Sequence, residues 1–221
     1  MKSSLTIIIL SLAAGLWSQS QHDSESFCFL ALGDSYTIGE SVSPEQRWPV
    51  QLAEKFSIHP GIDNVEVEII AKTGWTTGDL LEGVAAQLDA SRTYDLVSLL
   101  IGVNNQYQHL PFELYEPQFR LLLEKAINCA GGQNEKVFIV SIPDYAYTPS
   151  FRHHQEISNE IDKYNTLNRK IASEYGITYI DVTPISREGL KKTEYVAQDE
   201  LHPSAEQYTE WVKVMIEKFG R

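Results

Sequence analysis

The chain has 221 residues, of which 43% are hydrophobic and 22% are charged. This length and composition fit one folded domain of ordinary size and argue against an intrinsically disordered chain. Lysine and arginine total 18 against 30 aspartate and glutamate residues, which gives a formal net charge of -12 at pH 7. Such a surface repels phosphate backbones, so nucleic acid is not expected as a partner.

The N-terminus has the pattern of an export signal. A positively charged start precedes an apolar run over residues 5–16, and Ser18 and Ser20 then place small residues where a signal peptidase reads them. The pattern predicts a signal peptide over residues 1–20, cleavage before Gln21, and an exported protein that is periplasmic or secreted. The apolar run is shorter than the roughly 20 residues of a membrane span, so no stable span is expected after cleavage. An uncleaved N-terminal anchor is the alternative.

Strand-type and helix-type apolar patterns alternate from Ser26 onward. In chain order they predict a strand over 27–32, a helix over 45–56, strands and helices over 65–70, 79–90, 96–101, 112–130 and 137–142, a helix from Ile157 to Ile171 closed by Gly176, a strand over 177–182 and a helix over 208–219. Five strands separated by helices predict an α/β fold, a flavodoxin-like three-layer sandwich with a five-stranded parallel sheet. We expect a single domain over residues 21–221.

Chemically active residues are expected just after the strands, because ligands of such sheets bind beyond the carboxyl ends. Gly33-Asp34-Ser35 follows the first strand, so Ser35 would project from a strand-to-helix turn. A serine hydroxyl needs a base to act as a nucleophile. His202 lies three residues after Asp199, between the last strand and the last helix, where the carboxylate can orient the imidazole. Alone, the serine segment is equally compatible with a polar turn, and an aspartate three residues before a histidine is usually a solvent-facing pair. Together the two segments predict a Ser35, His202 and Asp199 relay.

Two further turns carry donors suited to stabilising an oxyanion. Gly74 follows the second strand and could present its backbone N–H, and Asn104 follows the third strand and could present its side-chain amide. Taken singly, both are compatible with ordinary turn residues. Their positions after adjacent strands predict that they lie beside Ser35.

These four segments, in this order, resemble the conserved blocks of the SGNH (GDSL-type) hydrolases. The blocks are Gly-Asp-Ser, a glycine after the second strand, Gly-x-Asn after the third, and Asp-x-x-His-Pro near the end, spread over residues 33–203. The resemblance implies a serine esterase that needs no metal or organic cofactor. It implies Ser35, Gly74, Asn104 and His202 as the four named residues, with Asp199 orienting His202 and the Ser35 backbone N–H joining the oxyanion hole.

The sequence departs from the commonest family pattern in two places. Tyr36 stands where many relatives have leucine, and Ile69 stands where an asparagine often precedes the glycine of the second block. The second departure leaves Gly78 as an alternative to Gly74. A G-x-S-x-G motif is absent, which disfavours the α/β-hydrolase route to an esterase.

The substrate is expected to be a small-molecule ester, a lipid or an acylated sugar. Trp75, Tyr107 and Tyr147, the last in the loop 143–151 after the fourth strand, are predicted to form an apolar wall for an acyl chain or sugar ring. Loop packing is the alternative for these residues. We favour carboxylic esters with short- or medium-chain acyl groups, with a carbohydrate O-acetyl esterase and a non-catalytic binding module as competing hypotheses.

The chain has two cysteines, Cys28 and Cys129. Two cysteines are no disulfide framework, so both are predicted to be buried free thiols, with a bridge between them as the alternative. Neither lies in a pattern typical of metal binding or of a nucleophilic thiol.

Overall fold

The computed structural model describes residues 26–58, 62 and 64–219. The predicted signal peptide over 1–20 lies outside the described residues, as do the two ends of the predicted domain, at 21–25 and 220–221. The strands are β1 (Phe27–Gly33), β2 (Val65–Ala71), β3 (Leu96–Leu100), β4 (Val137–Val140) and β5 (Thr178–Ile180).

The five strands form one parallel sheet with the order β2-β1-β3-β4-β5. The predicted α/β fold with a parallel sheet is therefore confirmed. Strand β1 lies between β2 and β3, so the chain moves to one side of β1 first and then crosses to the other. Such a reversal of strand order is where open α/β sheets bind their ligands.

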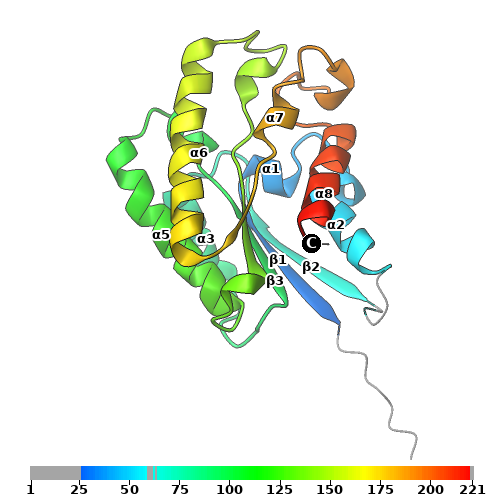
Figure 1. Cartoon of the computed structure of the whole chain (residues 1–221), viewed down its shortest axis with the longest axis vertical. Helices are drawn as coiled ribbons and strands as arrows, with labels where there is room; N and C mark the ends of the chain where they lie inside the picture. Colours follow the sequence, from blue (N-terminus) through cyan, green and yellow to red (C-terminus); the bar gives the residue numbers. More distant parts are fainter. Residues whose placement is uncertain (1–25, 59–61, 63, 220–221) are drawn as a thin grey trace, which may run out of the picture.

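Helices cover both faces of the sheet (Figure 1). Helices α2 and α8 pack together on one face, and α3, α5 and α6 cover the other. The helices are α1 (Ser35–Ile38), α2 (Trp48–Phe56), α3 (Thr77–Gln87), α4 (Val103–Tyr107), α5 (Phe112–Cys129), α6 (Gln155–Tyr175), α7 (Thr183–Ser186) and α8 (Ala205–Phe219), with short 3-10 turns at Pro44–Gln46, Asn134–Lys136, Tyr145–Tyr147 and Thr193–Tyr195.

Burial of β1 on both faces explains its continuous apolar sequence. Residues 29–32 are fully buried between the two helical layers. Strand β2 is different because it lies at the edge of the sheet, and its Glu66 and Glu68 both pair with Arg92. Charged side chains on an edge strand discourage pairing with another chain.

Two helix boundaries differ from the sequence prediction for identifiable reasons. The segment predicted as one helix over 45–56 divides into a 3-10 turn and α2, which begins at Trp48 with Pro49 in its first turn. Proline lacks a backbone N–H and is tolerated there but not deeper in a helix. Helix α3 begins at Thr77, two residues before the predicted start, because Thr76 and Asp79 form a reciprocal capping box.

Three short helices, α1, α4 and α7, were not predicted, because four or five residues are too few to show a periodic apolar pattern. Helix α4 starts immediately after Gly102, whose φ is 130°. A Cβ at this position would lie 2.6 Å from the Tyr115 hydroxyl oxygen. Glycine at 102 therefore lets the chain leave β3 against Tyr115 and fixes where α4 begins.

Both cysteines are free thiols; Cys129 is buried as predicted, whereas Cys28 is only half-buried. Within residues 26–58 and 64–219, none of the helices combines the length and apolar character needed to cross a bilayer.

Candidate active site

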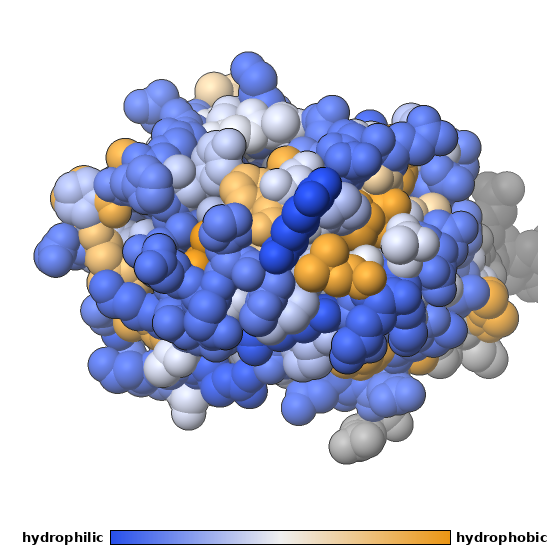
Figure 2. All heavy atoms as spheres, turned by 90° about the horizontal axis from the view of Figure 1, so that it is seen from above, coloured by the Kyte–Doolittle hydropathy of each residue, from blue (hydrophilic) through white to orange (hydrophobic). Residues whose placement is uncertain are grey.

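The carboxyl ends of the three central strands lie at the same level. Gly33, the last residue of β1, is opposite Ala71 of β2 and Leu100 of β3. The turns that follow these strands therefore meet at one edge of the sheet. There they enclose a cavity of about 230 Å³ lined by Ser35, Tyr36, Thr73, Gly74, Val103, Asn104, Tyr107, Tyr145, Leu201 and His202. Figure 2 looks down on this edge and shows apolar surface in its central part surrounded by hydrophilic side chains.

Ser35 is the first residue of α1 and is held in a tightly bonded turn. The Asp34 carboxyl group caps this helix, and its Oδ1 accepts a hydrogen bond from the Tyr36 backbone N–H at 3.0 Å. The Tyr208 hydroxyl of α8 donates to the Tyr36 carbonyl at 3.1 Å. The last helix thus anchors the turn that carries Ser35, whose side chain lies at the cavity wall.

The Asp199 carboxylate is saturated with hydrogen-bond donors. Its Oδ1 accepts from the backbone N–H groups of Leu201 and His202, and its Oδ2 lies 2.6 Å from His202 Nδ1 and accepts from Ser41 Oγ. Burial alone would raise the pKa of Asp199, but these hydrogen bonds lower it to about 2. Glu200 adopts a φ of 61°, which turns the loop back so that both backbone N–H groups reach one carboxylate oxygen.

The His202 imidazole is oriented from two sides. Asp199 binds Nδ1, which leaves Nε2 as the nitrogen available to the cavity. The Tyr36 ring meets the imidazole edge-on, with 5.8 Å between the ring centroids. Tyr36, which stands where the resembled pattern often has leucine, therefore packs against the histidine ring.

Ser35 and His202 face the same cavity but are not directly hydrogen-bonded in the described part of the chain. Contacts between a nucleophile and its base are often long until a substrate is bound. The predicted convergence of the serine, imidazole and carboxylate on one edge is present, and the catalytic roles of the three groups stay predictions.

The Gly74 turn is clamped by helix α4. Gln108, directly after α4, donates to the Gly74 carbonyl at 3.1 Å, and Asn104 Nδ2 donates to the Trp75 carbonyl at 2.9 Å. Gly74 has a φ of 84°, a region that side-chain-bearing residues rarely adopt. The alternative, Gly78, lies inside α3 and does not line the cavity.

Donors remain available for an oxyanion at this clamp. An amide side chain has two N–H bonds, so Asn104 keeps one after binding the Trp75 carbonyl. No hydrogen bond occupies the backbone N–H of Ser35 or Gly74 within the described ranges. Three donors from three turns thus border the cavity.

The neighbouring Asn105 has a structural position. It is 1% exposed, and its side chain exchanges two hydrogen bonds with Thr77, accepting from the backbone N–H and donating to the hydroxyl. These bonds tie the start of α4 to the start of α3. Two adjacent asparagines therefore have separate surroundings, Asn104 at the cavity and Asn105 in the core.

An aromatic wall closes one side of the cavity. Tyr107 and Tyr145 line it, and their rings contact each other and Phe151 at centroid distances of 4.8 to 6.4 Å. The Tyr145 hydroxyl donates to Gln106, which in turn donates to Glu160 of α6. Tyr145 is consequently fixed, whereas Tyr107 is 53% exposed at the cavity mouth.

Two of the three predicted substrate-binding residues do not line this cavity. The Trp75 ring packs on α3, where it occupies the space that a side chain at Gly83 would need. Tyr147 packs on His153 with 4.7 Å between the ring centroids. For Tyr147 the reason is the 3-10 turn Tyr145–Tyr147, capped by Asp144. Its first tyrosine lines the cavity and its last does not.

Tyr145 lines the cavity although it was not among the predicted substrate-binding residues, and the same holds for Thr73, Val103 and Leu201. Tyr145 follows β4 closely, so the rule that active residues come soon after a strand would have favoured Tyr145 over Tyr147.

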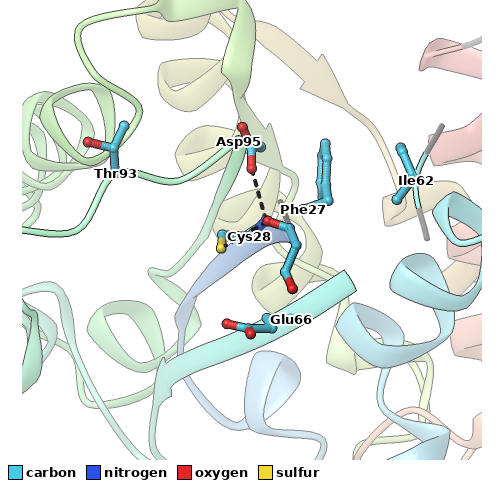
Figure 3. Close-up of a pocket in the computed structure, with 7 residues that line it drawn as sticks. Phe27, Cys28, Ile62, Glu66, Thr93 and Asp95 are labelled. Atoms are coloured by element: carbon cyan, nitrogen blue, oxygen red, sulfur yellow. Dashed lines mark hydrogen bonds between the residues drawn. The ribbon is translucent and has the colours of Figure 1, made fainter. Parts of the chain in front are cut away.

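A second cavity, of about 520 Å³, lies at the opposite, amino end of the strands (Figure 3). Cys28 and Asp95 line it, but the Asp95 carboxylate accepts from the Cys28 backbone N–H, and the thiol donates to the Ser26 carbonyl. Among the residues that the structure describes, no histidine lines this cavity, and neither of its carboxylates is bonded to the Cys28 thiol, since Glu66 is paired with Arg92. Among the residues described, no cluster of three or more His, Cys, Asp or Glu side chains could hold a metal ion.

Comparisons with known proteins agree with this geometry. Residues 31–209 match the model of the GDSL-like lipase/acylhydrolase family. A search of curated proteins found no match.

Solved structures with similar folds include three esterases or lipolytic proteins. Axe2, an acetylxylan esterase from Geobacillus stearothermophilus, has a TM-score of 0.67 at 18% identity over 88% of this chain and 94% of its own. A lipolytic G-D-S-L family protein from Veillonella parvula has a TM-score of 0.65 at 20% identity over 88% and 98%. The psychrotrophic esterase EstA from Pseudoalteromonas sp. has a TM-score of 0.65 at 16% identity over 88% and 97%.

The Asp34 carboxyl beside Ser35 differs electrostatically from Asp199. It is fully buried, and its Oδ2 has no hydrogen-bond partner among the described residues. Burial raises its pKa from 3.8 to about 7, although the backbone N–H of Tyr36 opposes the rise. Between about pH 4 and pH 7 the folded chain therefore keeps a proton that the unfolded chain has lost, so the stability contributed here falls as pH rises.

We predict that Asp34→Asn removes this pH dependence, because the amide is similar in shape and does not ionise. The measurement is urea unfolding at pH 5 and pH 8. Between these values the free energy of unfolding of the wild type should fall, relative to that of the variant, by on the order of 2 kcal/mol. Asp199 does not disturb the comparison, since a carboxyl with a pKa of about 2 is ionised at both values. Equal changes in the two proteins would contradict the prediction.

Proposed function

The chain belongs to the GDSL-like lipase/acylhydrolase family and is a carboxylic ester hydrolase, and we propose that Ser35 is its nucleophile and that it cleaves esters of short-chain acids. The observation that carries this proposal is the shared cavity. Ser35, Gly74, Asn104 and His202 come from four separate turns and all border the same 230 Å³ space.

The reaction proceeds in two acyl-transfer stages. His202 accepts the Ser35 proton as the hydroxyl oxygen attacks the ester carbonyl, and a tetrahedral intermediate forms. The intermediate collapses to an acyl-serine as His202 protonates the departing alcohol. Water then attacks the acyl-serine with His202 again as the base, which releases the acid and restores the serine.

Charge in both stages is managed by fixed groups. Asp199 binds His202 Nδ1 and stabilises the imidazolium that forms transiently. The N–H groups of Ser35 and Gly74 and the Asn104 amide are positioned to donate to the oxyanion. Asn104 already donates a hydrogen bond to the Trp75 carbonyl, next to Gly74. These donors therefore need to move little when negative charge develops on the substrate oxygen.

Cavity size supports a short acyl group. A volume of about 230 Å³ lies below the roughly 300–1,000 Å³ typical of pockets for larger ligands. Val103, Leu201 and Tyr145 supply apolar walls, and Tyr145 cannot swing aside without breaking its bond to Gln106. An acetyl, propionyl or butyryl chain fits these limits better than a long fatty chain.

The open mouth of the cavity supports a second candidate, a carbohydrate O-acetyl esterase. A small acyl pocket beside the exposed Tyr107 ring would suit an acetyl group on a sugar, since an aromatic face can support a sugar ring. One structurally similar protein is itself named an acetylxylan esterase. The two candidates share the acyl pocket and differ in the alcohol.

We further propose that the protein is exported. The support is the sequence alone: a positive start, an apolar run over residues 5–16 and small residues at 18 and 20. Ester hydrolysis without a diffusible cofactor is compatible with work outside the cytoplasm.

The proposed substrate class is tested with p-nitrophenyl esters of two to twelve acyl carbons and with acetylated xylo-oligosaccharides. We expect kcat/KM to be highest for acetate to butyrate and to fall at least tenfold by the octanoate, because longer chains exceed the cavity. Ser35→Ala should abolish hydrolysis of every ester while the thermal melting curve is retained, and a fluorophosphonate should label the wild type but not the variant. Hydrolysis by Ser35→Ala would remove the nucleophile assignment, and a preference for acetylated sugars would establish the second candidate.

The adjacent asparagines provide a matched pair for the oxyanion proposal. Asn104→Ala should lower kcat about a hundredfold, which corresponds to roughly 3 kcal/mol of barrier, with little change in stability. Asn105→Ala should instead lower the free energy of unfolding by on the order of 2 kcal/mol, because it leaves the buried Thr77 backbone N–H without a partner and removes the donor to the Thr77 hydroxyl, which keeps its bond to Gln118. Urea unfolding and steady-state kinetics on both variants separate these outcomes, and an unchanged kcat for Asn104→Ala would oppose its proposed role.

Export is tested by expressing the full chain and sequencing the N-terminus of the protein recovered outside the cytoplasm. We expect that terminus to be Gln21. Ile8→Arg interrupts the apolar run and should leave the protein uncleaved inside the cell. Recovery of an intact Met1 terminus from the membrane fraction would instead support an uncleaved anchor.

A further inference from the structure

Ser41 is placed against the relay although it is distant from it in sequence and does not line the cavity. Its Oγ donates to Asp199 Oδ2 at 2.6 Å, across 158 residues of chain. The same Oδ2 lies 2.6 Å from His202 Nδ1. One carboxylate oxygen therefore serves both the imidazole and the Ser41 hydroxyl.

The backbone around Ser41 is shaped for this contact. Gly39 ends α1 with a φ of 70°, and Ser41 itself adopts a φ of 66°, which is uncommon for a residue with a side chain. The N–H groups of Gly39 and Glu40 both donate to the Ser35 carbonyl. The turn at 39–41, left-handed at Gly39 and Ser41, thus connects Ser35 to a hydroxyl that contacts the loop 199–202, called the relay loop below.

The hydroxyl supplies something that the other donors do not. The N–H groups of Leu201 and His202 that hold Oδ1 belong to the same short loop as Asp199, and so does the imidazole that binds Oδ2. Ser41 is the one of these four donors that reaches the carboxylate from a different segment of the chain, so it ties the loop 199–202 to the turn after α1. Its hydrogen bond also lowers the pKa of the Asp199 carboxyl.

We propose that Ser41 is a positioning residue of the esterase. It holds the Asp199 carboxylate so that Oδ2 faces His202, and it keeps the relay loop in place beside the turn that carries Ser35. This inference rests on the proposed Ser35, His202 and Asp199 relay. Ser41 acts through Asp199 and does not touch the substrate, so its removal should slow chemistry without weakening substrate binding.

The test uses Ser41→Gly, which removes the hydroxyl and also relieves the left-handed backbone. With p-nitrophenyl acetate we expect kcat to fall about tenfold and KM to stay within about twofold, the scale expected for one hydrogen bond to a charged group. The rate of Ser35 labelling by a fluorophosphonate should fall in parallel, whereas the melting temperature should not. Ser41→Asn should recover part of kcat, because asparagine tolerates this backbone region and retains a donor.

Ser43→Ala is the matched control, since this serine is two residues away and its hydroxyl donates to Glu45 rather than to the relay. It should leave kcat and KM unchanged. A wild-type kcat in Ser41→Gly would overturn the inference, as would a loss of kcat explained wholly by a lower melting temperature. Ser35→Ala is measured beside them: its inactivity together with a fully active Ser41→Gly rejects the Ser41 role while leaving the proposed function intact.

Discussion

The alignment of three strand ends is the constraint on which the site depends. Gly33, Ala71 and Leu100 lie in register at the carboxyl edge of a parallel sheet, and the strand order reverses at β1. Each strand must then be followed by a turn that leaves the sheet in a different direction, and the turns border a common space. Burial of residues 29–32 on both faces fixes this register, because a shift of one residue would exchange every side chain between the two helical layers.

Within that frame, two carboxyl groups near Ser35 are kept in opposite states. Asp199 receives four hydrogen bonds and stays ionised to low pH, so it can stabilise positive charge on the imidazole. Asp34 receives one bond and is deeply buried, which favours its neutral form up to about pH 7. A neutral carboxyl beside Ser35, the proposed nucleophile, adds no negative charge where an oxyanion would develop. The two aspartates differ both in burial and in the number of hydrogen-bond donors that reach them.

Much of this organisation could be predicted from residue patterns. Buried strands have continuous apolar runs, and active residues follow them, so the fold and the meeting of Ser35, Gly74, Asn104 and His202 at one edge were foreseeable. What escaped prediction depends on local backbone geometry. A 3-10 turn decides that Tyr145 rather than Tyr147 lines the cavity, and a left-handed serine brings Ser41 to a residue 158 positions away. Neither feature alters apolar periodicity, so neither leaves a signal in it.

The aromatic wall shows how selectivity can be separated from catalysis in such a site. Tyr145 is tied through Gln106 to Glu160 on α6, so its position depends on the helical layer and not on the substrate. Tyr107 contacts the same cavity from the end of α4 but stays half-exposed. Tyr145 therefore limits the depth of the cavity with a side chain held in place, whereas the exposed Tyr107 side chain has room to move at the mouth. Because α4 also carries Asn104, a change at the mouth that shifted this helix would also move the proposed oxyanion donor, so the proposed alcohol site and the proposed chemical step share one helix.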